Sequence, residues 1–169
     1  VKGTLALPAQ GSIVINPQDE ATLSQTASIL IDDLKEMMGW EYTITTGKAK
    51  KNAIYLSLSK PDEQLGNEGY VLAINNKVSI EAPTTQGVFW GTRTLLQMLY
   101  RQEATLAKGT TRDWPEFPSR GLMLDVGRKF FTLEYLKQQI KVMSCYKMNE
   151  CQIHLNDNGF PQFFDNDWN

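Results

Sequence analysis

Apolar residues recur with a helical period in two stretches of the chain. In the first stretch they are spaced by four, three, four and three residues: Leu23, Ala27, Leu30, Leu34 and Met37. This spacing places them on one face of a helix, and Gly39 stands where helices commonly end. The second stretch carries one apolar face made of Val88, Gly91, Leu95 and Met98. Because glycine costs about 1 kcal/mol in a helix, Gly87 and Gly91 predict a second helix that packs closely against its neighbour.

Strand-like patterns fill the segments around these helices. Short runs that are β-branched or alternate apolar with polar side chains occupy residues 13–15, 41–46 and 53–59. Residues 69–82 hold two such runs joined at Asn75 and Asn76, which predicts a tight hairpin because asparagine tolerates a positive φ. The patterns in residues 1–108 therefore predict a small α+β domain, in which a largely antiparallel sheet carries two helices on one face.

The pattern changes after residue 108. Residues 109–119 are polar and contain two prolines, so they are expected to form a linker without regular structure. In residues 120–169 the apolar run "GLMLDV" leads to a helix that Thr132 can cap, and the short strand "CQIHL" follows. The apolar stripe of that helix is Leu133, Leu136, Ile140 and Met143. A strand, a helix and a strand in succession predict a βαβ unit with parallel strands.

Charge and composition narrow the classes of function. The net charge is −2 at pH 7, so nucleic acid is not an expected partner. No apolar run approaches the ~20 residues that span a bilayer. With a single histidine and no C-x-x-C pair, neither a zinc site nor another cofactor is expected. Cys145 and Cys151 are expected to be two buried thiols, with a disulfide as the alternative.

Polar residues gather where the two parallel strands of the βαβ unit end. Asp125 and Arg128 follow the first strand, and His154 and Asp157 follow the second. Because the carboxyl ends of parallel strands share one edge, we expect these side chains to form one wall of a polar pocket. Each residue also has a purely structural interpretation: a loop-fixing ion pair for Asp125 and Arg128, a core histidine for His154, and a turn at Asp157.

The stretch "FPSRGLMLDVGRKFFTLEYLKQQIKVMSCYKMNECQIHLND" resembles the start of the catalytic barrel of family 20 glycoside hydrolases, the β-N-acetylhexosaminidases. Members of that family have a strand ending Leu-Asp-x-x-Arg-His-Phe-Phe, then a helix, Lys-x-Asn, and a strand ending His-x-x-Asp-Asp. The upstream stretch "EGYVLAINNKVSIEAPTTQGVFWGTRTLLQML" is similar to the small α+β domain that precedes the barrel. The resemblance implies a fold of α+β class, followed by a βαβ fragment of a TIM barrel.

The resemblance also implies roles for the polar residues. Arg120 matches an arginine that hydrogen-bonds the 3- and 4-hydroxyls of the terminal sugar, a task suited to the planar fork of a guanidinium. His154 and Asp157 match residues that line or support the sugar pocket, while Asp125 and Arg128 match supporting positions behind it. Arg120 begins its strand, so it would have to reach inward along the barrel to join the others.

The sequence departs from the family at three places. Lys129 stands where the family has histidine, Asn158 stands for the second aspartate, and "GFPQFF" follows where Gln-Gly-Trp is usual. The family's reaction is substrate-assisted: the 2-acetamido oxygen attacks the anomeric carbon, an aspartate orients it, and a glutamate is the acid and base. That pair lies in a Gly-Gly-Asp-Glu motif, which this sequence lacks, so no catalytic residue is expected in the chain and the chain alone is predicted to be inactive.

Two other interpretations stay open from the sequence. One is a stand-alone carbohydrate-binding or interaction module, and the other is the front part of another sugar hydrolase, such as an α-glucuronidase. The resemblance implies glycans that contain N-acetylhexosamine as partners and a secreted, periplasmic or lysosomal location. Because a βαβ fragment exposes strand edges and an apolar helix face, self-association of the chain is also expected.

Overall fold

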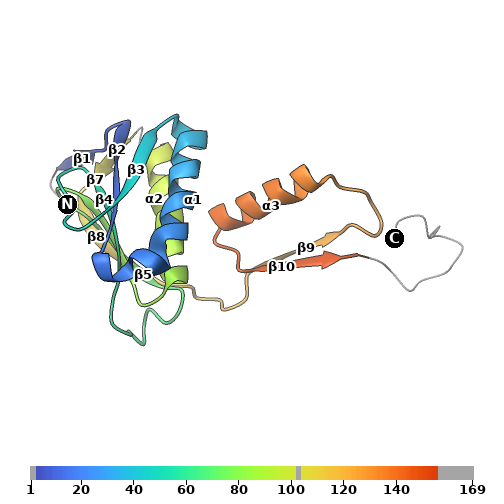
Figure 1. The fold of residues 1–169 in the computed structure, drawn as a ribbon. Helices are drawn as coiled ribbons and strands as arrows, with labels where there is room; N and C mark the ends of the chain where they lie inside the picture. The colour runs from blue at the N-terminus through green and yellow to red at the C-terminus, as the bar shows by residue number, and fades with distance from the viewer. Residues whose placement is uncertain (1–2, 102–103, 156–169) are drawn as a thin grey trace, which may run out of the picture. The chain divides into compact units, whose positions relative to one another are not determined.

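The computed structural model describes residues 3–101 and 104–155 and divides into two compact units, Val1–Glu116 and Phe117–Asn169 (Figure 1). The first unit is a six-stranded sheet with two helices on one face. The second unit is a strand, a helix and a strand. In the described part of the chain, no helix is long and apolar enough to cross a membrane.

The sheet of the first unit is mixed rather than largely antiparallel, so that part of the sequence prediction is wrong. Its order is β3-β2-β4-β6-β5-β8. The strands are β2 (Gln10–Ile15), β3 (Glu41–Thr46), β4 (Ile54–Leu58), β5 (Tyr70–Ile74), β6 (Val78–Ala82) and β8 (Gly109–Asp113). Strands β3, β2, β4 and β6 run parallel, and only β5 pairs antiparallel with its neighbours β6 and β8. The helix between β2 and β3 returns the chain to the end of the sheet at which β2 began, so β2 and β3 run parallel.

Two further strands and a hairpin complete the strand pairing. Strand β1 (Thr4–Ala6) pairs antiparallel with β7 (Thr105–Ala107) as a separate two-stranded ladder. The hairpin predicted between β5 and β6 is confirmed, and its loop is Asn75–Lys77, closed by a hydrogen bond from the Asn75 N–H to the Lys77 carbonyl at 3.0 Å. Neither Asn75 nor Asn76 has a positive φ. The loop therefore turns over three residues, and not over two asparagines with a positive φ.

Helix α1 (Glu20–Met38) follows a short 3-10 turn, η1 (Pro17–Asp19), and ends at Gly39 as predicted, with φ 68°. Its apolar stripe is buried from Leu23 to Leu34, but Met37 is 43% exposed, which is a correction to the predicted face. In the last turn Met38, four residues after Leu34, packs against the core instead. The apolar stripe thus continues from Leu34 to Met38, four residues later, and not to Met37, three residues later.

Helix α2 (Thr85–Arg101) lies directly on the sheet, as its glycines predict. A Cβ on Gly91 would overlap the Ile80 side chain, and one on Gly87 would overlap the backbone carbonyl of Gly69. Val88 and Leu95 are fully buried on the same face, and Met98 is partly buried against the core. The two glycines therefore let the helix backbone come close to strands β5 and β6.

The expectation that residues 109–119 lack regular structure is wrong for residues 109–113, which form β8. A buried tyrosine fixes the end of this strand: the Tyr70 hydroxyl bonds Asp113 Oδ2 at 2.5 Å and Thr94 Oγ1 at 2.6 Å. Burial and the neighbouring Asp113 carboxylate together raise the pKa of Tyr70. The Tyr70 hydroxyl thereby links β5, helix α2 and the end of β8.

The second unit confirms the predicted βαβ arrangement. Strands β9 (Gly121–Asp125) and β10 (Glu150–His154) are parallel, and α3 (Leu133–Cys145) connects them. Thr132 caps α3, because its hydroxyl accepts a hydrogen bond from the Tyr135 N–H at 3.2 Å. The two described cysteines, Cys145 and Cys151, are exposed and not joined by a disulfide, so the expectation of buried thiols is wrong.

Candidate functional site

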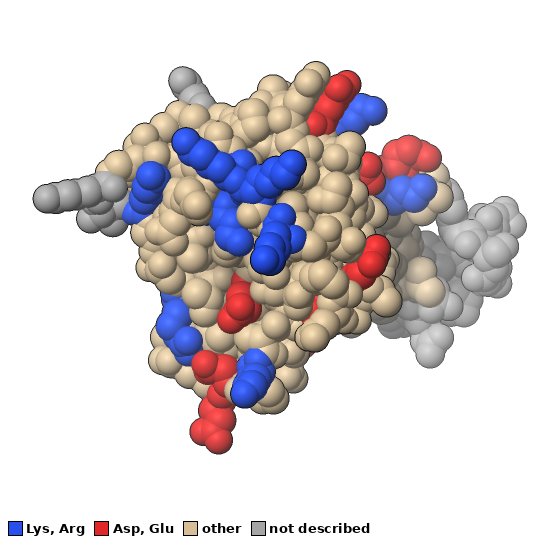
Figure 2. All heavy atoms as spheres, turned by 60° about the vertical axis from the view of Figure 1, so that its left-hand side comes forward, with Lys and Arg blue, Asp and Glu red and all other residues tan. Residues whose placement is uncertain are grey.

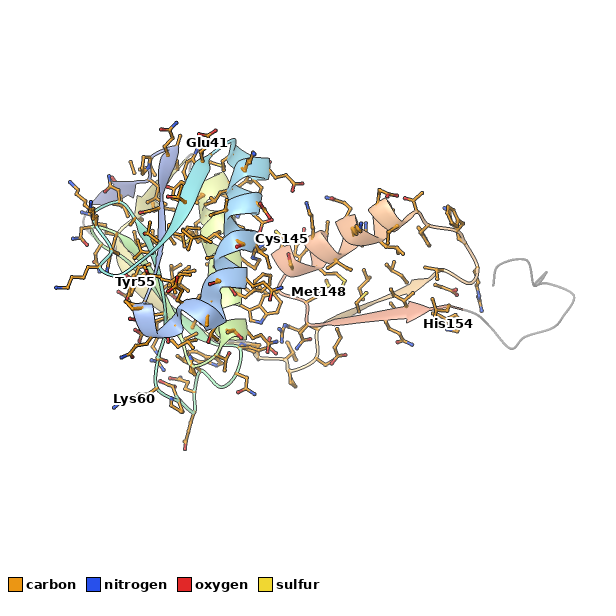
Figure 3. All side chains as sticks on the ribbon, in the orientation of Figure 1. Glu41, Tyr55, Lys60, Cys145, Met148 and His154 are labelled. Carbon is orange, nitrogen blue, oxygen red and sulfur yellow. The ribbon has the colours of Figure 1, made fainter. Side chains whose placement is uncertain are left out.

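Asp125 and His154 lie side by side at the carboxyl ends of the parallel strands β9 and β10. They are direct partners in the strand register, so their side chains leave the sheet on the same face. The turn after β9 is held to the end of β10, because the His154 carbonyl accepts hydrogen bonds from Val126 N–H at 3.0 Å and Gly127 N–H at 3.1 Å. We call this edge, made of Asp125, Arg128 and His154, the polar rim. Figure 3 labels His154 at the end of β10.

The ion pair of the structural interpretation of Asp125 and Arg128 is present. Asp125 Oδ2 lies 3.2 Å from Arg128 Nε, and Asp125 Oδ1 accepts the Arg128 backbone N–H at 3.1 Å. The Arg128 side chain is 71% exposed, so solvent screens the pair and its contribution to stability is small. The carboxylate therefore shapes the loop after β9 mainly through its bond to the backbone.

His154 is half-buried at the end of β10, whereas Asp157 lies outside the described residues. A carboxylate, a guanidinium and an imidazole on one edge offer both donors and acceptors, as sugar hydroxyls require. Among the described residues, no group of three or more His, Cys, Asp and Glu side chains is placed to hold a metal ion.

Arg120 lies at the opposite, amino-terminal end of β9. Its guanidinium donates from Nε to the Lys147 carbonyl and from Nη1 to the Phe117 carbonyl, both at 2.8 Å. Five residue steps along β9 separate the backbone of Arg120 from that of Asp125 by about 17 Å at ~3.3 Å per residue. The structure thus brings Asp125, Arg128 and His154 together but does not bring Arg120 to them.

The residues that hold Arg120 in place were missed as functional positions in the sequence. Asn149 Oδ1 accepts the Arg120 N–H at 3.0 Å, and Asn149 Nδ2 donates to the Pro118 carbonyl at 2.8 Å. Ser119 Oγ donates to Glu150 Oε2 at 2.8 Å and adds a second link between the strand starts. The sequence signal for the contacts of Arg120 was the stretch "KMN", because it supplies both Lys147 and Asn149.

Lys147 presents its carbonyl to Arg120 because of how α3 ends. Its φ is 55°, the Lys147 N–H donates to Ser144 O at 3.0 Å, and the Met148 N–H donates to Met143 O at 2.9 Å. These two bonds form the left-handed cap that usually contains glycine. The helix end therefore aims a backbone acceptor at the start of β9.

The first unit is a mixed sheet with helices on one face, and the second is a parallel strand–helix–strand with polar residues at the strand ends, as at the start of a β/α barrel. The family model for glycosyl hydrolase family 20, domain 2, matches residues 1–114. The model for the glycosyl hydrolase family 20 catalytic domain matches residues 117–165. The chain belongs to glycosyl hydrolase family 20.

Curated relatives are consistent with this membership. The beta-hexosaminidase of Porphyromonas gingivalis is 32% identical over 146 residues, covering 80% of this chain and 19% of its own length. The beta-N-acetylhexosaminidase of Cellulomonas fimi is 34% identical over 125 residues, covering 69% of this chain and 24% of its own length. The chain thus spans less than a quarter of the length of these two relatives.

Solved structures agree in fold. A mutant Streptomyces plicatus beta-hexosaminidase in complex with its product GlcNAc matches with a TM-score of 0.79 at 28% identity, covering 93% of this chain and 32% of that chain. The family 20 beta-N-acetylhexosaminidase of Streptomyces coelicolor A3(2) matches with a TM-score of 0.77 at 27% identity, covering 93% and 33%. The second unit is therefore the start of a TIM-barrel catalytic domain.

Proposed function

We propose that this chain is the front portion of an enzyme that hydrolyses terminal β-linked N-acetylglucosamine or N-acetylgalactosamine. The observation that carries the proposal is the succession of two family 20 matches, domain 2 and then the catalytic domain, along one chain. The parallel pair β9–β10 with its polar rim supports it, because barrel enzymes place their chemistry at the carboxyl ends of the strands.

Substrate-assisted retention is the proposed mechanism, one of the exceptions to the two-carboxylate scheme of glycosidases. In it the acetamido group of the sugar is the nucleophile, and the protein must orient that group and protonate the leaving oxygen. The Gly-Gly-Asp-Glu motif expected for these two tasks is not in the sequence. The residues of this chain would contribute binding and positioning only.

Each site residue has a proposed role within that mechanism. His154 and Asp157 would contact the sugar or support its pocket. Arg120 would bind the 3- and 4-hydroxyls by turning its guanidinium away from the Lys147 and Phe117 carbonyls and reaching inward along the barrel. Asp125 and Arg128 would hold the loop behind them, and their ion pair and backbone bond support this role. The two hydrogen bonds to the His154 carbonyl fix the backbone from which the imidazole projects, which supports a positioning role.

The test compares the 169-residue chain with the protein encoded by the whole gene on an aryl N-acetyl-β-glucosaminide. We expect turnover by the whole protein and no release above background by the chain, because the chain has no Gly-Gly-Asp-Glu motif. The matched control is the whole protein with the motif's glutamate changed to glutamine, which should lose nearly all activity. Hydrolysis of aryl β-glucuronides or α-glucuronides in place of the N-acetylhexosaminide would contradict the proposal.

We further propose that the isolated chain self-associates through its second unit. Several apolar side chains of this unit are exposed: Met123, Leu133, Ile140, Ile153 and Leu155. Such faces are normally covered in a closed barrel. Light scattering of the purified chain should give a mass above that of the monomer, and Leu133→Ser with Ile140→Ser should lower it. A strict monomer at all concentrations would rule the association out.

A further inference from the structure

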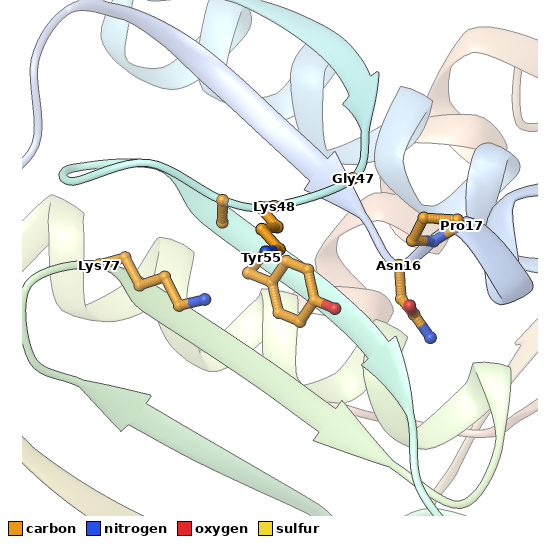
Figure 4. A pocket seen from close by; sticks show the side chains of 7 residues that line it. Asn16, Pro17, Gly47, Lys48, Tyr55 and Lys77 are labelled. Atoms are coloured by element: carbon orange, nitrogen blue, oxygen red, sulfur yellow. The ribbon is translucent and has the colours of Figure 1, made fainter.

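An open hollow lies on the first unit, on the sheet face turned away from the helices (Figure 4). It has a volume of about 570 Å³ and is lined by Asn16, Pro17, Gly47, Lys48, Ala49, Tyr55 and Lys77. Tyr55 of β4 forms its floor: its strand neighbours Ile54 and Leu56 are fully buried in the core, so Tyr55 points to the opposite face. None of these residues belongs to the polar rim.

The loop that forms one wall of the hollow, residues 47–52, is fixed at both ends. At its start the Gly47 N–H donates to the Ile15 carbonyl at 3.2 Å, and at its end the Asn52 N–H donates to the Asn76 carbonyl at 2.8 Å. Gly47 has φ 118° and Asn52 has φ 61°, so both ends use left-handed turns. The wall that this loop forms is thus held by backbone hydrogen bonds at both of its ends.

The charged residues that line the hollow are lysines. Lys48 and Lys77 line it, and Lys50 and Lys51 belong to the same loop. Figure 2, which brings this side of the first unit forward, shows Lys and Arg side chains gathered in the middle of one face. Lysines grouped in this way favour a ligand that carries negative charge.

Two carboxylates lie near Tyr55, and both accept hydrogen bonds from the protein. Asp19 Oδ2 accepts from Asn16 Nδ2 and from the Leu58 N–H, each at 2.8 Å, while Glu81 Oε2 accepts from Ser57 Oγ at 3.4 Å. Burial first, and then these two carboxylates, raise the pKa of the Tyr55 hydroxyl, which like any tyrosine hydroxyl is a neutral donor at pH 7. Lys48 and Lys77, unlike these two acids, line the hollow itself.

The floor of the hollow suits a sugar ring rather than a bare anion. Tyr55, Pro17 and Ala49 give it apolar surface, and the Lys77 ammonium lies 4.3 Å from the centre of the Tyr55 ring. A volume of about 570 Å³ is in the range of small-ligand sites. An apolar ring face beside the ammonium groups of Lys48 and Lys77 matches a pyranose that bears a carboxylate or a sulfate.

We propose that this hollow is a second glycan-binding site, which takes an acidic sugar residue of an oligosaccharide. Lys48 and Lys77 would pair with the carboxylate or sulfate, and the Tyr55 ring would contact the C–H face of the sugar. The choice of amino-sugar oligosaccharides as ligands rests on the proposed hexosaminidase function. The binding itself requires only the first unit's residues and no catalysis.

The test measures binding of the 169-residue chain to three tetrasaccharides by calorimetry: chondroitin, chondroitin 4-sulfate and neutral chitotetraose. We expect binding of one or both acidic chains and weaker or no binding of chitotetraose. Lys48→Gln with Lys77→Gln should weaken acidic-chain binding about tenfold, since two exposed ion pairs contribute on the order of 0.5–1 kcal/mol each. Tyr55→Leu should weaken it further while leaving both lysines in place.

The matched control is Lys35→Gln with Lys60→Gln, which makes the same change in net charge on exposed positions that do not line the hollow. It should keep the affinity, and thermal unfolding should be alike for all variants. An equal loss in the control, equal binding of chitotetraose, no binding at all, or inorganic sulfate binding as tightly as the oligosaccharide would each overturn the proposal. A whole protein without hexosaminidase activity would overturn the proposed function but leave this binding result unaffected.

Discussion

Replacing Asp33 by alanine should lower the free energy of unfolding of the first unit by about 3–5 kcal/mol, the cost of stranding a buried charge. Arg93 of α2 is only 4% exposed, and Asp33 of α1 is the carboxylate that pairs with it. Arg93 Nε and Nη2 also donate to Thr92 Oγ1 at 3.2 and 3.1 Å, and its guanidinium lies 4.5 Å from the centre of the Phe89 ring. Without Asp33, the guanidinium would keep its burial and lose its counter-charge.

Asp32→Ala is the matched control, since it makes the same chemical change on the same helix at an exposed position. It should shift the unfolding free energy by no more than about 0.5 kcal/mol. Urea unfolding followed by the fluorescence of Trp40 and Trp90 measures both variants. Replacing the pair together, as Asp33→Ala with Arg93→Leu, should recover much of the loss because no charge is left buried. Equal stability of the two single variants would show that the ion pair does not hold the helices together.

This pair also shows what a sequence pattern cannot predict. Asp33 and Arg93 are 60 residues apart, and a helical stripe treats both as polar positions that face solvent. The stripe itself was found from local spacing, and Leu23, Leu30 and Leu34 are buried as expected. Local periodicity therefore predicted the elements, whereas the partner of a buried charge depends on how two helices pack.

Strand direction was missed for a related reason. Alternation shows which residues face the core, but the same alternation occurs in parallel and antiparallel strands. The direction of β4 and β6 is set by where the connections cross, and β8 was hidden in a polar stretch next to Pro115. In the βαβ unit the crossover makes the two strands parallel, so the placement of Asp125 and His154 at one edge could be predicted, although their register could not.

The polar residues also differed in how well their partners could be predicted from the sequence. The partners of Asp125 and Arg128 are close in sequence, so their ion pair could be anticipated. The partners of Arg120 are backbone carbonyls of Phe117 and Lys147, which leave no mark in a side-chain pattern. The hollow above Tyr55 went unnoticed because lysines at positions 48, 50 and 51 are typical of a solvated loop.

Changing Arg120 to lysine in the whole protein should reduce kcat/KM on an aryl N-acetyl-β-glucosaminide roughly 10- to 150-fold, from the ~1.5–3 kcal/mol of hydrogen bonds to a charged group. A guanidinium has five donors and can hold carbonyls and sugar hydroxyls together, whereas an ammonium has three on a single atom. Arg128→Lys is the comparison, because that side chain is largely exposed and its loss should be smaller.

Arg120 has two competing roles, and a substrate lacking the 4-hydroxyl separates them. If Arg120 binds that hydroxyl, the unmodified enzyme should prefer the complete substrate and Arg120→Lys should lose the preference. If Arg120 only holds the carbonyls of Phe117 and Lys147, both substrates should slow by the same factor, and a lower thermal stability should accompany the loss. Only the first outcome fits a sugar-binding arginine, because discrimination between substrates arises from groups that touch the part by which they differ.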